Sequence, residues 1–198
     1  SGIAAERPLS FFAYGLGDIT PATEGGPQWA THYDMRMQLK AARLAGQPAQ
    51  ALDTAVLLAK HRAFSPATAD SLVRGLILEW LSHTHDADSV QRLWLQLNAA
   101  QRAMPDLAAE LALRFVALGG TGAMAKPWLQ VVWIPLHAAP SNWSADQLAR
   151  MVQAMEACLL DAQAPDARQW LSQIESAQLA NPQDACLQYL AGMLCLRH

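Results

Sequence analysis

Cysteine is scarce in this chain of 198 residues, which contains only Cys158, Cys186 and Cys195. The three form no CxxC motif, so neither a thioredoxin-like redox site nor a four-cysteine zinc site is indicated. Cys186 and Cys195 would lie about 180° apart on one helix, at about 3.6 residues per turn, and cannot pair locally. We therefore expect reduced thiols packed in a core.

The chain has no excess of basic residues. It carries 14 Lys and Arg against 17 Asp and Glu, a net charge of −3. Proteins that bind a phosphate backbone concentrate positive charge, so we expect no nucleic-acid partner. A GxGxxG fingerprint for dinucleotides is also absent from the sequence.

Long apolar runs are missing as well. No run reaches the roughly 18 residues of a membrane-spanning helix. The first residues lack the charged and apolar regions of a signal peptide. We expect a soluble piece that contacts a membrane only through anchor segments outside this sequence.

Helix-forming residues dominate what is present. Leu, Ala and Gln are abundant and β-branched residues are few, which favours helix over sheet. Apolar residues recur at helical spacing, and Pro and Gly interrupt them at intervals. The pattern predicts an all-α protein of about nine helices. Their approximate ranges are 33–45, 48–62, 66–82, 88–103, 106–118, 122–134, 144–159, 165–179 and 182–197, with a late start or a kink at Pro127 and a long break over 135–143.

Two regions are predicted from this pattern. Residues 1–34 hold many glycines and prolines and form an irregular N-terminal arm, which we expect to pack on the rest through the aromatic stretch 9–14. Residues 35–198 form a domain of helical hairpins. The ninth helix has no partner, so we expect the array to be cut within a repeat, or the exposed face to be covered in a homodimer.

Small residues recur at the spacing of tetratricopeptide repeats. Gly46 precedes Ala51, and Gly120 precedes Ala125, by the five positions that separate the end of a first helix from its contact with the second. Pro182 and Gly192 fit the proline-to-glycine interval. The spacing predicts stacked hairpins in a right-handed α-solenoid. The alternative is an irregular all-α domain in which small residues merely recur.

Three longer segments carry a more specific likeness. They are ARLAGQPAQALDTAVLLAKHRAFSPATADSL (42–72), RLWLQLNAAQRAMPDLAAELALRFVALGG (92–120) and QWLSQIESAQLANPQDACLQYLAGMLCLR (169–197). Their Leu, Ala, Pro and Trp positions resemble the HemY-type proteins of proteobacteria, which are inner-membrane proteins with tetratricopeptide repeats encoded with haem-biosynthesis genes.

This resemblance implies a role and a location. It implies two membrane helices before this piece, more repeats after it, and a soluble part on the cytoplasmic side of the bacterial inner membrane. It also implies a non-enzymatic scaffold that binds protein partners, including haem-biosynthesis enzymes. No catalytic residue, metal ligand or cofactor is implied.

Six charged residues and one tyrosine on the first helices of the hairpins are the candidate binding groups. Counting from the turn residues, they fall where a tetratricopeptide array faces its inner groove. Charge-assisted hydrogen bonds from this groove would bind an acidic or carboxylate-bearing segment. If the stripe is only a solvated face, reversing Arg36 and Lys40 to Glu changes nothing. If it binds, reversal abolishes capture and leaves melting nearly unchanged. The candidates are Arg36, Lys40, Arg43, Glu110, Arg114, Tyr189 and Arg197.

One polar loop offers a different chemistry. His83, His85, Asp86 and Asp88 are dense enough for a metal site, which would make the chain a metal-dependent hydrolase. Asp86 or Asp88 also lies where an N-cap is needed for the next helix. Loop and cap are the competing interpretation.

A tetrapyrrole carrier or regulator is the alternative function. Haem needs His, Met or Cys directed into an apolar pocket, and His61 and His137 are conceivable ligands among many Met and Trp residues. Core packing explains the same Met and Trp positions.

The glycine-rich segment of Gly119, Gly120 and Gly122 has two interpretations, a phosphate-binding loop or a turn between helices. The Lys-Ser/Thr of a P-loop does not follow these glycines.

Overall fold

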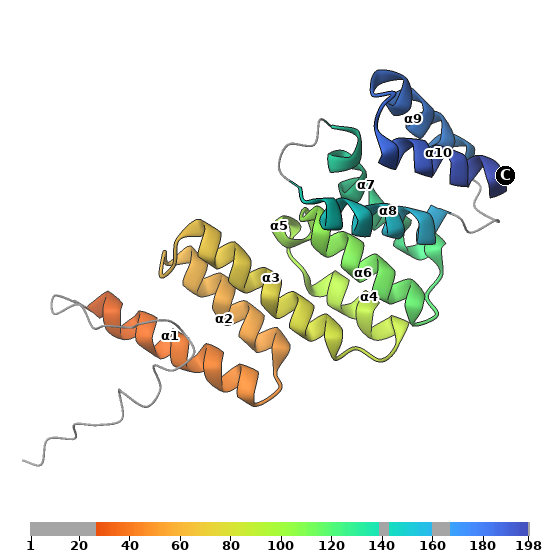
Figure 1. Cartoon of the computed structure of the whole chain (residues 1–198). Coiled ribbons are helices and arrows are strands. Elements are labelled where there is room, and N and C mark those ends of the chain that lie inside the picture. Colours follow the sequence, from red (N-terminus) through yellow and green to blue (C-terminus); the bar gives the residue numbers. More distant parts are fainter. Residues whose placement is uncertain (1–26, 139–142, 160–166, 198) are drawn as a thin grey trace, which may run out of the picture. The chain divides into compact units, whose positions relative to one another are not determined.

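The computed structural model describes residues 27–138, 143–159 and 167–197, and this part of the chain is helical throughout, without a strand (Figure 1). The prediction of an all-α protein is confirmed. Ten helices are present in these ranges rather than nine. They are α1 (Pro27–Leu44), α2 (Pro48–Lys60), α3 (Pro66–Ser82), α4 (Ala87–Gln96), α5 (Ala99–Arg102), α6 (Pro105–Ala117), α7 (Gly122–His137), α8 (Ala145–Leu159), α9 (Ala167–Ala180) and α10 (Ala185–Arg197).

The chain divides into two compact units. The first ends at Ile77 and the second begins at Leu78, within α3. The boundary predicted at residue 34 falls inside α1, because the helix already begins at Pro27. Of the arm predicted over residues 1–34, residues 1–26 lie outside the described residues.

A helical hairpin of α1 and α2 forms the core of the first unit (Figure 1). Gly46 joins the two helices with φ +64°, a left-handed conformation that glycine adopts without strain. The amide of Gln47 donates to the carbonyl of Ala42, and that of Gly46 to Arg43, which is the Schellman closure of a helix. Ala51 is buried where α2 begins, as the repeat spacing predicts.

The same closure ends α2 with a less suitable residue. Arg62 has φ +56°, and the amide of Ala63 donates to the carbonyl of Leu58. Ser65 then accepts a hydrogen bond from the amide of Thr68 and Pro66 opens α3, which gives this helix an N-cap and a first-position proline.

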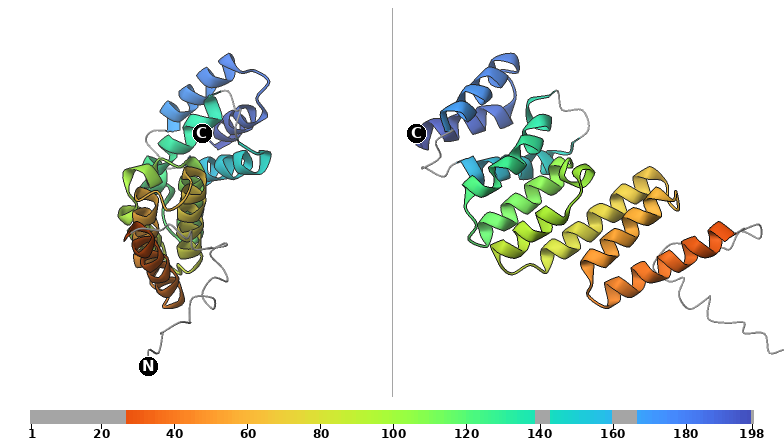
Figure 2. Two further views of the ribbon diagram at one scale, coloured as in Figure 1. Left: turned by 90° about the vertical axis from the view of Figure 1, so that its left-hand side faces the viewer. Right: turned by 180° about the vertical axis from the view of Figure 1, so that it is seen from behind.

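In the second unit, α6 is the central helix. It packs against α7 and α8, while α4 and α5 cover another side of it. Trp128 of α7 stacks on Trp94 of α4 with ring centroids 4.7 Å apart and contacts Phe115 of α6 at 5.3 Å. The last hairpin, α9 and α10, lies side by side in both views of Figure 2, and α10 also packs on α8.

The glycine-rich segment between α6 and α7 is a turn. Gly119 has φ +91° and the amide of Gly120 donates to the carbonyl of Phe115. A Cβ on Gly122 would lie 2.7 Å from the backbone oxygen of Cys158, so only glycine lets the start of α7 approach the end of α8 this closely. The turn interpretation of this segment is therefore confirmed.

Several predicted helix boundaries are wrong. Asn98 and Gln101 form a capping box that opens a separate α5, so α4 ends at Gln96 instead of running toward residue 103. Asp184 accepts from the amides of Cys186 and Leu187, which starts α10 at Ala185 rather than at Pro182.

The helix α7 continues through both of its prolines. It begins at Gly122 and continues to His137 through Pro127 and Pro135, although late start, kink and break were predicted there. Burial of one face outweighs the lost backbone hydrogen bonds, since Trp128, Leu129, Val132 and Leu136 are almost fully buried. Ser144 and Gln147 form a capping box before α8. The predicted start at Pro165 lies outside the described residues.

Among the helices that the structure describes, none is both long and apolar enough to cross a bilayer.

Candidate partner-binding groove

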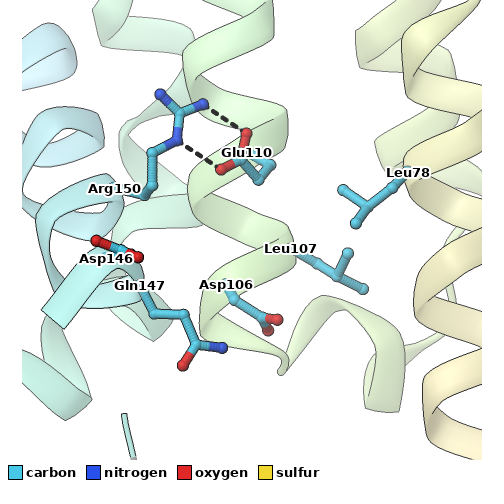
Figure 3. A pocket seen from close by; sticks show the side chains of 7 residues that line it. All are labelled: Leu78, Asp106, Leu107, Glu110, Asp146, Gln147 and Arg150. Carbon is cyan, nitrogen blue, oxygen red and sulfur yellow. Dashed lines mark hydrogen bonds and ion pairs between the residues drawn. The ribbon is translucent and has the colours of Figure 1, made fainter. Parts of the chain in front are cut away.

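Two adjoining hollows form a groove over α6, between the end of α3 and the start of α8. Figure 3 shows the residues that line the first of them. Their volumes are ≈ 340 and ≈ 550 Å³, and their walls share Leu78, Glu110 and Arg150. All of the lining residues belong to the second unit. We call this surface the α6 groove. Its lining residues are Leu78, Leu81, Ser82, Asp106, Leu107, Glu110, Leu113, Arg114, Ala117, Asp146, Gln147 and Arg150.

Leucine side chains give the groove an apolar base. Leu81 and Leu107 are buried beneath it, and Leu113 is half-buried. Leu78 is 37% exposed and points across the first hollow toward Leu107 (Figure 3). A concave surface lined by apolar side chains with a few polar groups is where proteins most often bind a ligand.

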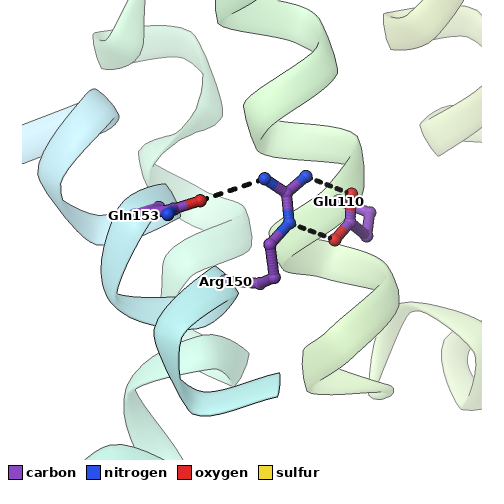
Figure 4. A network of polar contacts seen from close by, with 3 residues as sticks. All are labelled: Glu110, Arg150 and Gln153. Atoms are coloured by element: carbon purple, nitrogen blue, oxygen red, sulfur yellow. Dashed lines mark hydrogen bonds and ion pairs between the residues drawn. The ribbon is translucent and has the colours of Figure 1, made fainter. Parts of the chain in front are cut away.

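An ion pair crosses the groove from α8 to α6 (Figure 4). The Nε and Nη2 of Arg150 donate to the two carboxylate oxygens of Glu110 at 2.7 and 2.6 Å, and Nη1 donates to Gln153 at 3.0 Å. The hydrogen bonds with Glu110 raise the pKa of the Arg150 guanidinium above its ordinary value. This two-pronged geometry holds both side chains in place on the groove wall.

Arg114 has a structural partner. It lies one helical turn beyond Glu110, and its Nη2 donates to the backbone oxygen of Thr84 at 2.6 Å, while its Nε is buried without a hydrogen bond. The guanidinium thereby ties α6 to the loop before α4. Its charge also lines the second hollow.

The predicted basic stripe on α1 consists of Arg36, Lys40 and Arg43, and part of it makes contacts within the protein. Arg36 donates from Nη2 to the backbone oxygen of Ala63 at 2.9 Å and lies 4.7 Å from the ring centre of Phe64. Lys40 is half-buried and Arg43 is exposed. Since α1 belongs to the first unit, the structure does not join this stripe to the groove residues on α6.

The last two candidates lie on α10. The hydroxyl of Tyr189 donates to a carboxylate oxygen of Glu156 on α8 at 2.8 Å. Arg197 ends the helix, and its side chain lies outside the described part of the chain. Tyr189 thus links two helices instead of standing alone on a surface.

Sequence reasoning missed most of the residues that line the groove. Leu78, Asp146 and Arg150 lie on α3 and α8, and only Glu110 and Arg114 on α6 were singled out. Counting residues back from each turn identifies which face of one helix points to the groove. It does not show which residues of α6 and α8 lie opposite each other. The lone cation of α8 among apolar residues, Arg150, was the available signal.

The polar loop before α4 acts as a helix cap. Asp86 accepts hydrogen bonds from the amide and hydroxyl of Ser89 at 2.7 and 2.8 Å, which confirms the N-cap interpretation. These bonds lower the pKa of the Asp86 carboxyl. His83 points back to the carbonyl of Glu79, with Nδ1 at 2.7 Å. Within the described ranges, no three His, Cys, Asp or Glu side chains are placed to share a metal ion.

The two conceivable haem ligands lie in different units. His61 follows α2 and its ring centroid is 6.4 Å from that of His32. His137 ends α7, stacked on Trp133, with Nδ1 2.8 Å from the carbonyl of Trp133. Core packing of the large apolar residues is confirmed for Trp128, Trp133, Trp170, Met151 and Met155, which are nearly inaccessible, whereas Met124 is exposed.

The three cysteines are free thiols. Cys158 is fully buried, and this burial raises its pKa to about 12, so it stays protonated at neutral pH and is a poor nucleophile. Burial also raises the pKa of Cys186. Cys195 is exposed, so the predicted packing in a core is wrong for this residue.

No family model matches this chain, and no solved structure gives a significant match. The resemblance to HemY-type proteins therefore stays a prediction from its sequence segments.

Proposed function

We propose that this chain is a non-enzymatic module of tetratricopeptide-like helical hairpins that binds a segment of a partner protein in the α6 groove. The observation that carries the proposal is the groove itself, where an exposed leucine stands beside an ion pair that braces its wall. A stack of hairpins buries a continuous core and leaves such a face available for a partner.

The local structure supports the repeat interpretation. Gly46 and Gly119 close helices with the same left-handed geometry, and Ala51 and Ala125 are buried at the hairpin contacts that follow. Recurring closures at recurring contacts are typical of helical repeats.

The HemY-type resemblance supplies the biological setting. In this proposal the parent protein is anchored in a bacterial inner membrane and holds enzymes of haem biosynthesis on the cytoplasmic side. The module contributes shape and electrostatics, and the enzymes contribute the chemistry.

Site-specific cross-linking tests the proposal. A photoreactive amino acid replaces Leu78 in the groove of the full-length membrane form, or Leu95, which is 62% exposed on α4. We expect position 78 to cross-link a small, reproducible set of proteins, identified by mass spectrometry, and position 95 to miss them. Equal products from both positions, or none from position 78, would contradict a docking role for the groove.

A further inference from the structure

The charges along the α6 groove are unevenly distributed. The first hollow is lined by three carboxylates, those of Asp106, Glu110 and Asp146, and by one guanidinium, that of Arg150. The second hollow is lined by Glu110, Arg150 and Arg114. Because Glu110 and Arg150 form a two-pronged ion pair, their charges largely cancel in both hollows. Besides this pair, the lining carboxylates of Asp106 and Asp146 belong to the first hollow, and the lining guanidinium of Arg114 belongs to the second.

Helix stability alone explains why each carboxylate is there. Asp106 and Asp146 lie in the first turns of α6 and α8, where a negative charge is favoured by the helix dipole. It does not explain why both carboxylates line one hollow with an exposed leucine at its edge. We base the inference of a ligand on this combination, in which both carboxylates and the partly exposed Leu78 line one hollow.

We propose that the α6 groove binds an extended peptide segment with a basic side chain at the Asp106–Asp146 end, an apolar side chain against Leu78 and Leu107, and an acidic side chain toward Arg114. This inference rests on the proposed function and specifies the partner of the same site. Opposite charges at the two ends make the segment complementary to the groove.

The helix geometry sets the spacing within the segment. Asp106 and Arg114 are eight positions apart on α6, which corresponds to about 12 Å at about 1.5 Å per residue. An extended chain advances about 3.3 Å per residue, so the basic and acidic residues are about four positions apart. The apolar residue then falls midway, opposite Leu78. The simplest matching peptide is Lys-Ala-Leu-Ala-Glu with blocked ends.

The braced ion pair has a specific part in this recognition. Arg150 already donates hydrogen bonds to Glu110 and Gln153. An incoming carboxylate therefore binds Arg150 less well than it binds Arg114. A segment with acidic residues at both ends would place one of them against Asp106 and Asp146. Like charges brought together in this way disfavour binding.

Binding of short peptides to the isotope-labelled chain, followed by amide chemical shifts, tests this inference. We expect Lys-Ala-Leu-Ala-Glu to bind at millimolar concentration and to shift amides of α6, of the start of α8 and of the end of α3. Glu-Ala-Leu-Ala-Glu and Lys-Ala-Ala-Ala-Glu should bind at least about tenfold more weakly, which is about 1.4 kcal/mol. Preference for the doubly acidic peptide, shifts confined to other helices, or no binding by any peptide would overturn it.

Two double variants separate local from general electrostatics. In D106N/D146N we expect the advantage of the lysine-containing peptide to fall to about twofold or less. The matched control D53N/D70N changes net charge equally at exposed sites on α2 and α3 and should keep the full advantage. A loss of the advantage in both variants would show a net-charge effect and overturn the inference.

The outcomes also separate this inference from the proposed function. If position 78 cross-links a partner but the peptides show no preference for a basic end, the charge pattern is refuted and the docking role stands. If position 78 cross-links nothing and no peptide binds, both are refuted.

Discussion

At the scale of single residues, arginine side chains act as internal donors that hold loops to helices. Arg36 reaches the carbonyl of Ala63, Arg114 that of Thr84, and Arg102 those of Trp94 and Leu95 at the end of α4. From sequence spacing, Arg36 and Arg114 were predicted to be groove residues. Spacing identifies the helix face of a long side chain, but the loop carbonyl that it reaches depends on the tertiary fold.

The first prediction concerns Arg36 and revises the expectation that reversing it leaves melting nearly unchanged. Arg36→Glu places a carboxylate beside the Ala63 carbonyl and the face of Phe64, where it loses a charge-assisted hydrogen bond. We expect a loss of about 2 kcal/mol in the free energy of unfolding. The control Arg43→Glu, an identical charge change at an exposed site, should cost less than about 1 kcal/mol. Equal effects in urea titrations would refute the role of Arg36.

The second prediction concerns the pH dependence of Asp86. Its folded pKa lies below the ordinary value, so its cap stabilises the fold above about pH 4 and is lost as the pH falls through the folded pKa. Asp86→Ser keeps a capping oxygen that does not titrate. We expect the melting temperature of the Ser variant to fall less than that of the wild type between pH 5 and pH 2, by about the amount of one titrating group. Parallel curves for the two proteins would argue against the cap.

At the scale of helices, a helix end can be located from the local sequence where a polar side chain caps it or a residue with left-handed backbone closes it. The cap at Asp86 was predicted from the sequence and is confirmed, and the caps at Ser65 and Ser144 follow the same local chemistry. The continuation of α7 through Pro127 could not, because burial against α6 and α8 outweighs the loss of a backbone donor. The break before α5 was predictable in principle, because Asn98 followed three residues later by Gln101 is the sequence pattern of a capping box.

Helix closure at Arg62 gives the third prediction. A non-glycine residue at φ +56° is strained by about 1 kcal/mol. Arg62→Gly should therefore stabilise the protein by about that amount, while Gly46→Ala, at φ +64°, should destabilise it similarly. Thermal unfolding of the two variants measures both effects. A stabilising Gly46→Ala would contradict the shared closure.

The contact between α7 and α8 gives the fourth prediction. A Cβ at Gly122 would meet the backbone of Cys158, so Gly122→Ala should cost about 1–3 kcal/mol through overpacking. A Cβ at Gly192 on α10 meets nothing within 4 Å, so Gly192→Ala should add about 0.5–1 kcal/mol from helix propensity. Urea unfolding compares the two. The same sign for both variants would mean that the helices are not this close.

At the scale of the whole chain, composition and helical spacing together predict the all-α class, while the site depends on pairing across helices. The α6 groove joins Leu78, Glu110 and Arg150 from three helices, and no pattern in one helix specifies that register. The solenoid arrangement and a homodimer through α10 stay predictions. The prediction that the last helix has no partner is wrong, because α10 packs against α9. On α10, Cys195 and Leu196 are exposed, the latter by 82%.

The alternative function, a tetrapyrrole carrier, is tested by haem binding to the whole molecule. A haem site formed by His61 or His137 would give a shifted Soret band when haem is added to the purified protein. The partner-binding account predicts no shift, and no change when both histidines are replaced.

The central claim is that partners dock on the α6 groove, and one comparison of variants tests it most directly. Full-length protein carrying Leu78→Glu or Leu95→Glu is compared with the wild type for thermal unfolding and for quantitative recovery of the proteins that cross-link at position 78. We predict that both variants unfold like the wild type, that Leu78→Glu loses at least about tenfold in recovery, and that Leu95→Glu loses none. Undiminished recovery with Leu78→Glu, in a protein that is still folded, would contradict the account.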